Sequence, residues 1–359
     1  MSVAQRAAPA GGAVDGGTAS LQPPASRGLR ALRGIGLLAA FGALALVLLL
    51  SVWLGTRGIP FGATWDLLWH PDGSENAVII HAYRIPRTVV GVLVGVALGL
   101  SGALMQAITR NPLAEPGVLG VSLGAATGVV VGIAFLGVST VPGYLWFAVA
   151  GAAVATVVVY TIGSAGRAVA TPERLVLAGA AVTAVLYAFN TAVLLLHPRA
   201  FDEFRFWNVG SLAGRDLDVV WPVLPLVVAG VLLALLLTRP LNALAMGDQL
   251  GRALGAHIGR TRALGALAAT LLCGAATAAA GPIAFVGLAV PHIARMIVGP
   301  DQRWVLPYSL VLAPTLLVGS DVLGRVIAGP GEVQVGIVTA FLGAPLFIAL
   351  CRKRKLGSL

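Results

Sequence analysis

Residue types that carry out covalent or metal chemistry are few in this sequence, and they are not spaced to act together. The only lysines, Lys353 and Lys355, lie at the C-terminus, whereas a P-loop needs a lysine inside its glycine-rich turn to hold nucleotide phosphates. Neither Cys273 nor Cys351 has the spacing of a metal ligand. We therefore expect a chain that is not an enzyme, that binds no metal or cofactor, and that leaves any ATP to a partner.

The composition indicates a membrane protein. Hydrophobic residues make up 58% of the chain, charged residues make up 11%, and 46 residues are glycine. A soluble domain with so little charge would precipitate, and small residues are typical of closely packed membrane helices. We predict an all-α, polytopic membrane protein. We interpret the net charge of +10 as orienting charge at helix ends and expect no nucleic-acid partner.

Apolar segments separated by polar turns predict about ten membrane spans. The expected spans are about 35–54, 88–107, 118–136, 145–162, 175–196, 219–238, 263–279, 284–296, 305–323 and 335–350. Residues 1–33 are expected to form a disordered cytoplasmic tail, and 34–359 the transmembrane domain. Residues 64–69 are expected to form a short outer helix with tryptophans at headgroup level.

The charge distribution orients these spans. Most of the 24 Lys and Arg residues then fall on the cytoplasmic side, as the positive-inside rule requires, and both termini are inside. The segment of about 241–262 is expected to form amphipathic cytoplasmic helices. The arginines expected outside are Arg57, Arg84, Arg87, Arg199, Arg205, Arg215 and Arg325.

The expected spans contain almost no ionisable residues, whereas ion-driven carriers usually have them at mid-membrane. This pattern favours a permease that takes its energy from a partner. A secondary transporter or channel acting alone remains the alternative, and a membrane enzyme is a weaker one because no catalytic constellation is recognised.

Three blocks of sequence resemble the FecCD-type permeases, the membrane subunits of ABC importers for ferric siderophores, haem and cobalamin. The blocks are Arg84-Ile-Pro-Arg87 through Asn111-Pro112 and Pro116 to Ala125, then Gly281 to Arg303, then Asp321 to Phe347. The resemblance covers about 37–354 and implies a type II ABC importer permease fold. It implies a ferric siderophore as cargo, with haem or cobalamin as alternatives.

The resemblance also implies partners and a location. The partners are a second permease subunit, identical or paralogous, a pair of ABC ATPase subunits, and an extracytoplasmic substrate-binding lipoprotein. The chain would lie in the lipid bilayer of the cytoplasmic membrane.

Arginines matching Arg84, Arg87 and Arg325 dock the binding protein in the family, and we expect these three to form that docking site. The alternative for Arg84 and Arg87 is anchoring at the headgroups. The alternative for Arg325 is a local ion pair with Asp321, one helical turn earlier.

The resemblance assigns three further groups. The expected ATPase-coupling residues are Met246, Gly247, Asp248, Gln249, Leu250, Arg252, Leu254 and Gly255. The expected inner gate is Thr171, Pro172, Glu173 and Arg174. Residues expected to shape the fold are Asn111, Pro112, Pro116, Pro291, His292, Asp321 and Pro345.

Overall fold

The computed structural model describes residues 27–138, 140–164, 172–253, 255–328 and 331–352, and within these ranges every regular element is a helix. Seven of these helices are long and apolar enough to cross a membrane, and three shorter apolar helices accompany them. The predicted all-helical, polytopic architecture is confirmed, and each of the ten expected spans corresponds to one of these helices.

The helices fall into three groups by length and position. The long ones are α1 (Arg27–Trp53), α4 (Ile85–Thr109), α6 (Val141–Gly163), α7 (Pro172–Leu196), α9 (Val220–Leu236), α12 (Ile258–Ala280) and α14 (Gln302–Ile327). The shorter apolar ones are α5 (Val121–Leu136), α13 (Val286–Val298) and α15 (Val335–Arg352). Short helices at the ends of the bundle are α2 (Phe61–Trp69), α3 (Glu75–Val78), α8 (Pro198–Asn208), α10 (Thr238–Ala245) and α11 (Asp248–Ala253).

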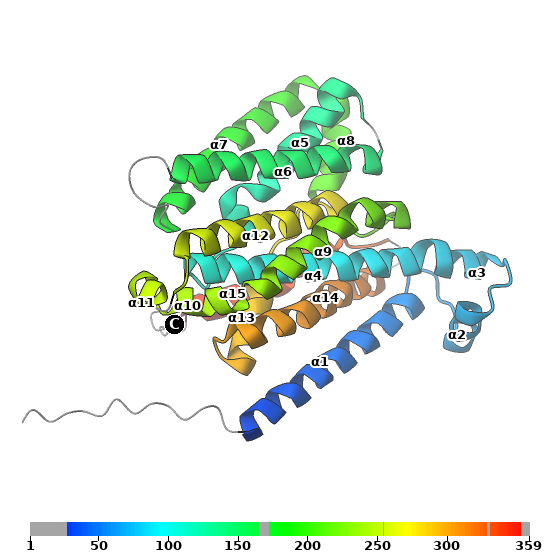
Figure 1. Cartoon of the computed structure of the whole chain (residues 1–359). Coiled ribbons are helices and arrows are strands. Elements are labelled where there is room, and N and C mark those ends of the chain that lie inside the picture. Colours follow the sequence, from blue (N-terminus) through cyan, green and yellow to red (C-terminus); the bar gives the residue numbers. More distant parts are fainter. Residues whose placement is uncertain (1–26, 139, 165–171, 254, 329–330, 353–359) are drawn as a thin grey trace, which may run out of the picture.

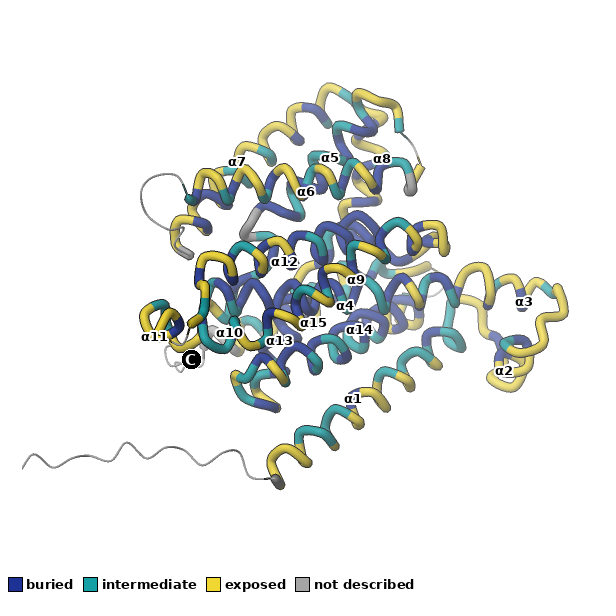
Figure 2. The backbone as a smooth tube through the Cα atoms, in the orientation of Figure 1, coloured by how far each residue is buried: buried dark blue, intermediate teal, exposed yellow. Residues whose placement is uncertain are grey.

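Helix α4 runs through the centre of the bundle, between α12 and α14 (Figure 1). Helices α5 to α8 form a group on one side, and α1 lies at the opposite edge. Burial follows this order, because α4 and α12 are the most enclosed spans and α1 is the least enclosed (Figure 2).

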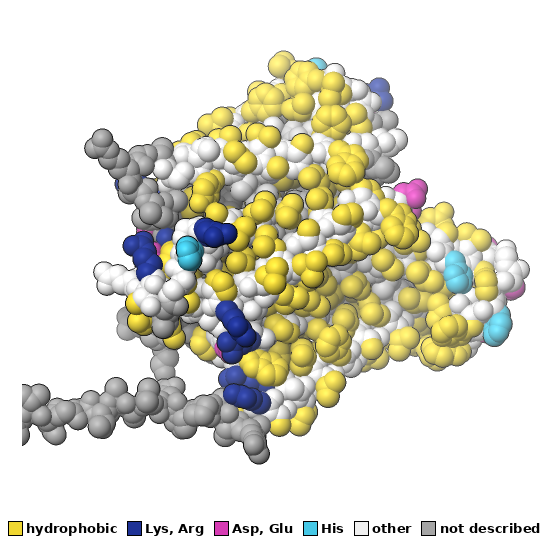
Figure 3. Space-filling view, in the orientation of Figure 1, with side chains coloured by type: hydrophobic (Ala, Val, Ile, Leu, Met, Phe, Trp, Pro, Cys, Tyr) yellow, Lys and Arg dark blue, Asp and Glu magenta, His cyan; other side chains and the backbone are white. Residues whose placement is uncertain are grey.

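The two ends of the bundle differ in charge. We call the end that carries α2, α3 and α8 the α2 end, and the end that carries α10 and α11 the α11 end (Figure 1). On the face shown in Figure 3, most Lys and Arg side chains gather at the α11 end, and apolar side chains cover the surface between the ends. This distribution matches a bundle that is surrounded by lipid along its length.

Small residues allow the central helices to approach closely. Gly102 of α4 faces Gly287 of α13, and a Cβ atom added at Gly102 would overlap the backbone of Gly287. Gly287 lies one residue into α13, so this short helix begins deep in the bundle beside α4. Backbone contact of this kind is typical of membrane helices, where dispersion forces replace the hydrophobic effect.

Three expected boundaries differ from the structure. Helix α1 begins at Arg27, so residues 27–33 are helical where a tail was expected. No proline lies within this helix, so it extends through the arginines that precede its apolar run. Residues 258–262 belong to α12 and not to the coupling segment. The helix expected at 64–69 is α2, which begins three residues earlier at Phe61, and its Trp65 and Trp69 are exposed.

The close approach of α4 and α13 predicts a stability defect for Gly102→Ala. The added methyl group meets backbone atoms that cannot rotate away, so we expect a loss near the upper end of the usual ~1–3 kcal/mol for overpacking. The measurement is thermal unfolding in detergent, followed by reaction of the buried Cys273 thiol with a maleimide dye in a Cys351→Ala background. Gly42→Ala is the control because nothing lies within 4 Å of its added Cβ. Equal midpoints for the two variants would contradict the predicted packing.

Candidate functional site

Five arginines line one cavity of about 360 Å³ at the α2 end. They come from the loop after α1, the start of α4, the loop before α9, and the end of α14. We call this the arginine cavity, and its arginines are Arg57, Arg84, Arg87, Arg215 and Arg325. The cavity brings together all three arginines expected to dock a binding protein.

Arg84 closes the end of α1. Its guanidinium donates to the carbonyl oxygens of Val52, at 3.0 Å, and Trp53, and to that of Arg57 at 2.6 Å. Those carbonyls belong to the last turn of a helix and the loop after it, where no intrahelical donor is available. Arg84 is the last residue of a π-helical segment, Ile79–Arg84, that runs directly into α4. Its side chain is therefore buried and held by backbone.

Asp321 of α14 joins two arginines. Its carboxylate accepts three hydrogen bonds from Arg87 of α4, at 2.7, 2.9 and 3.2 Å, and lies 3.0 Å from the guanidinium of Arg325. Arg87 also pairs with Glu332 at 2.8 Å. Arg325 donates onward to the carbonyls of Ser51 and Leu54, at 2.9 and 3.0 Å. The local Asp321–Arg325 pair is thus present, and it is one part of a network that ties α14 to α4 and α1.

The structure places the expected docking residues at different depths. Arg84 and Arg325 are buried beneath the surface. Their guanidinium N–H groups donate to the carbonyl oxygens at the end of α1. Arg57 is half exposed and pairs with Glu75. Arg215 is buried, and its guanidinium donates to the Ser211 carbonyl oxygen at 3.5 Å. Sequence reasoning did not select Arg57 or Arg215 for docking. Both were expected outside, and an arginine on that side is the same signal that pointed to Arg325.

The expected coupling segment forms two short helices, α10 and α11, at the α11 end. Leu241 and Leu244 of α10 are fully buried, whereas Met246 and Leu250 are exposed. Gly247 and Gly255 adopt positive φ angles of 99° and 82°, which frame α11 with tight turns.

Asp248, the first residue of α11, pairs with Arg110 at 2.9 Å and with Arg262 at 3.0 Å. Gln249 and Arg252 are exposed, and Leu254 lies outside the described residues.

The expected inner gate is described only in part. Thr171 lies outside the described residues, and Pro172 begins α7. Glu173 and Arg174 are exposed on the first turn of this helix.

The motif after α4 closes a tight turn. Arg110 has a left-handed φ of 51° and ends α4, and the Asn111 side chain accepts from the Leu113 backbone at 2.9 Å. Pro112 follows in this turn, and Pro116 begins a single 3-10 turn before α5. The chain therefore reverses without a continuous helical ladder, as prolines require.

The remaining motif residues lie along α13 and α15. Pro291 and His292 are buried inside α13, and Pro345 is exposed inside α15. His292 Nδ1 has no hydrogen-bond partner among the described residues. One turn later, Arg295 donates to the side chain of Gln106 in α4, and Gln106 donates to the Leu288 carbonyl at 3.1 Å. These contacts lock α13 against α4.

Glu115 is a residue that sequence reasoning missed. Its carboxylate accepts from the backbone N–H of Phe285 at 3.3 Å, just before α13. It lines a cavity of about 180 Å³ together with Leu98, Ser122 and Cys273. Hydropathy assigns residues between spans to water, but this loop folds back into the bundle. An ionisable group from outside the expected spans therefore lies among the helices.

Ser122 lies in the spacing Gly120-x-Ser-x-Gly124 that is typical of hydrolase nucleophiles, a motif absent from the expectations above. The structure places Ser122 in the first turn of α5, 3.8 Å from Cys273. A nucleophilic serine needs a base within hydrogen-bond reach, and no histidine is among its described partners. Within the described residues, no group of three His, Cys, Asp or Glu residues could hold a metal ion.

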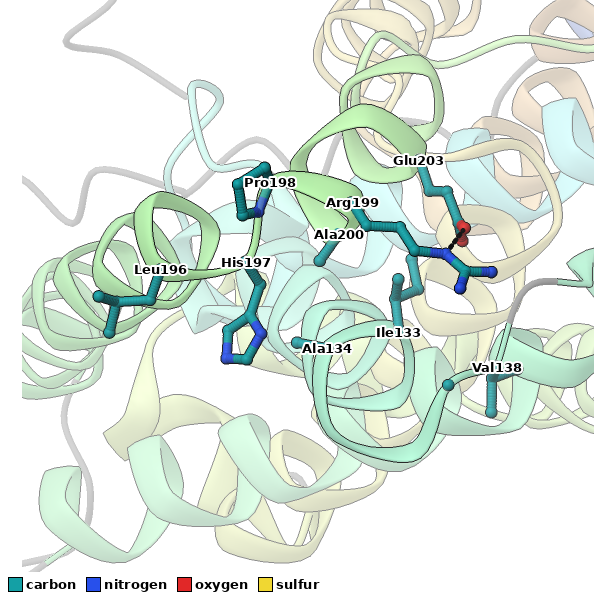
Figure 4. A pocket seen from close by; sticks show the side chains of 10 residues that line it. Ile133, Ala134, Val138, Leu196, His197, Pro198, Arg199, Ala200 and Glu203 are labelled. Carbon is teal, nitrogen blue, oxygen red and sulfur yellow. Dashed lines mark hydrogen bonds and ion pairs between the residues drawn. The ribbon is translucent and has the colours of Figure 1, made fainter.

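A second cavity at the α2 end, of about 300 Å³, lies between α5 and the α7–α8 junction. Figure 4 shows Arg199 and Glu203 of α8 joined by their ion pair of 3.3 Å, and the ring of His197 directed toward α5. His197 packs edge-on against Phe135. An exposed pair one turn apart contributes little, so this cavity has weaker recognition chemistry than the arginine cavity.

Comparison with known proteins gives a consistent result. The model of the FecCD transport family matches residues 43–353. The ferric enterobactin transport system permease protein FepD of Escherichia coli K12 is 46% identical over 309 residues, which cover 86% of this chain and 92% of FepD. The Fe(3+)-citrate import system permease protein YfmD of Bacillus subtilis 168 is 43% identical over 304 residues, which cover 85% of this chain and 90% of YfmD.

A solved structure of a metal-chelate type ABC transporter in an inward-facing conformation has the same fold. It aligns with a TM-score of 0.78 at 25% sequence identity, covering 89% of this chain and 99% of that chain.

The burial of Asp321 predicts that Asp321→Asn destabilises the bundle. The substitution leaves Arg325 without its carboxylate and Arg87 with Glu332 alone, and breaking a buried pair costs about 3–5 kcal/mol. Glu75→Gln is the control, because the Arg57–Glu75 pair is exposed and such pairs contribute about 0–1 kcal/mol. The Cys273 unfolding assay should show a large loss for the first variant and almost none for the second. Similar small losses would mean that Asp321 does not hold the network together.

Proposed function

The chain belongs to the FecCD transport family, and we propose that it is the permease subunit that carries a ferric siderophore or a related iron chelate across the cytoplasmic membrane. The observation that carries the proposal is the match along nearly the whole chain to permeases whose names specify ferric chelates. The permease itself performs no chemistry in this scheme. ATP is hydrolysed by a separate subunit.

We place the partner ATPase at the α11 end. Helix α10 is anchored by its buried leucines, while Met246, Gln249, Leu250 and Arg252 are exposed on and beside α11. An exposed apolar and polar surface on a short helix suits insertion into a cleft of another protein. This orientation puts both termini, and the basic end of the bundle, in the cytoplasm. Glu173 and Arg174 would then lie at the inner gate.

We place the binding protein at the arginine cavity. Asp321, Glu332 and Glu75 are the carboxylates paired with its arginines, so positive charge is in excess. Arg84 and Arg215 have no carboxylate among their described partners. Acidic side chains on a lipid-anchored binding protein would supply the missing charge, with Arg57 at the surface and the more buried Arg84, Arg87 and Arg325 setting the potential from below. Complementary charge of this kind sets register and association rate.

We propose that the functional unit contains two permease subunits, identical or paralogous, with the cargo path between them. Long, exposed apolar faces on α7 and α15 support this arrangement, since they need either lipid or a second bundle. The path should bind cargo weakly, because a strong site inside it would trap the chelate.

The proposal predicts that uptake depends on ATP. Proteoliposomes that hold the permease and its ATPase should accumulate radioactive iron supplied as ferric enterobactin with the binding protein. They should do so only when ATP is present on the side of the membrane that carries the ATPase. The permease alone, energised by a proton or sodium gradient, should accumulate none, and accumulation there would favour a secondary transporter. Parallel arms with haem and cobalamin distinguish the cargo, and preferred uptake of either would overturn the siderophore assignment.

The arginine cavity predicts a defect in association for Arg57→Glu. Reversing a charge at the rim should slow association of the binding protein by about tenfold at low salt, with a smaller effect at high salt. Stopped-flow mixing of the binding protein with permease in nanodiscs measures the rate. Arg199→Glu is the matched control, because it is exposed at the same end but lines the other cavity. If both variants associate at the wild-type rate, the arginine cavity is not the docking site.

A further inference from the structure

Asp248 lies where the coupling segment meets the transmembrane helices. One oxygen of its carboxylate, Oδ1, is 2.9 Å from a guanidinium nitrogen of Arg110 and 3.0 Å from one of Arg262. Arg110 is the residue that ends α4, and Arg262 lies in the second turn of α12. A single carboxylate therefore connects α11 to the two most enclosed spans of the bundle.

The backbone sets these three charges in place. Gly247 turns the chain with its positive φ, so that α11 begins with Asp248 directed at the bundle. Arg110 adopts a left-handed conformation where α4 ends, and its side chain thereby reaches the Asp248 carboxylate. These are local features of two separate turns, and together they form the contact.

Arg262 makes this contact difficult to replace. Its side chain is only 6% exposed, and its Nε atom is buried without a partner among the described residues. Asp248 is the carboxylate that pairs with it. A buried guanidinium that loses its carboxylate is left uncompensated, so Arg262 must follow Asp248 or hold it in place.

The neighbouring helix α10 is attached in a different way. It packs through Leu241 and Leu244, and its Asn242 bonds to Asp301 at 2.6 Å, next to the start of α14. Among the described ion pairs, those of Asp248 are the ones that join α11 to α4 and α12. Movement of α11 relative to α10 would therefore act on α4 and α12 through this carboxylate.

We propose that Asp248 is the positioning residue that transmits movement of the ATPase to α4 and α12, through its shared ion pair with Arg110 and Arg262. This rests on the proposed function, in which the ATPase contacts α11. Helix α4 continues from this contact to Arg87 at the arginine cavity. A displacement at the ATPase thus has a rigid route to the end where the binding protein docks.

The test measures transport and ATP hydrolysis together in proteoliposomes that contain the full complex. We expect Asp248→Asn to keep the ATPase bound and hydrolysing, while iron transported per ATP falls at least tenfold and stimulation by the binding protein is lost. Asp248→Glu, which keeps the charge, should restore much of the ratio. Arg260→Gln is the control, because this exposed arginine lies two residues from Arg262.

A double-mutant cycle tests the pairing itself. Arg110→Gln should lower the transport ratio in the wild-type background and have little further effect when Asp248 is already asparagine. Arg110 is 38% exposed, so this variant should fold even if Asp248→Asn does not. Additive effects would overturn the proposal.

The remaining outcomes separate the two proposals. A wild-type ratio in Asp248→Asn, or a parallel fall of transport and hydrolysis, would overturn a transmitting role. Loss of the ATPase from Asp248→Asn alone would show that the residue serves docking instead. Failure of the wild-type permease to bind any ATPase would overturn the proposed function.

Discussion

A guanidinium buried in a membrane bundle must find fixed acceptors, because neither lipid nor an apolar side chain can replace its water. Arg84 and Arg325 find them in the backbone carbonyls at the end of α1. The end of a helix also leaves those carbonyls without intrahelical donors. The guanidinium and the carbonyl oxygens therefore meet each other's need for a hydrogen-bond partner. Helix α1 is the least enclosed long helix of the described bundle, and this exchange of hydrogen bonds helps to attach it to α4 and α14, together with the bonds of Arg33 to Tyr308 and of Ser51 to Thr88.

At each end of α4, one carboxylate is shared by two arginines. At the α2 end, Asp321 is shared by Arg87 and Arg325, and at the α11 end, Asp248 is shared by Arg110 and Arg262. Between them, α4 is a continuous helix of 25 residues, packed through glycine against α13. A rod with a charged contact at each end can carry a rigid-body displacement, which is one of the established forms of domain movement.

The sequence predicts the bundle well because apolar runs, prolines and charged flanks are local signals. The Asp321–Arg325 pair was predictable for the same reason, since its members lie one turn apart on a single helix. The acceptors of Arg84 were not, because they depend on a π-helical segment that sets its direction.

Contacts between distant segments were also beyond the reach of local signals. The pairing of Arg110 with Asp248 joins two turns far apart in the sequence, and Glu115 enters the bundle because its loop folds back. The roles expected for docking, gating and coupling stay predictions, since they depend on partners.

The two shared carboxylates differ in exposure, and this difference separates their roles. The Asp321 side chain is 1% exposed, so opening its ion pairs would leave charge in a dry interior. The Asp248 side chain is 32% exposed and that of Arg110 is 38% exposed, so water can reach this pair, whereas Arg262, at 6%, stays buried beside Asp248. Asp321 therefore suits a permanent joint that holds α1, α4 and α14 together at the α2 end. Asp248 suits a contact that can adjust at Arg110 while it keeps Arg262, as the proposed movement of α11 would require.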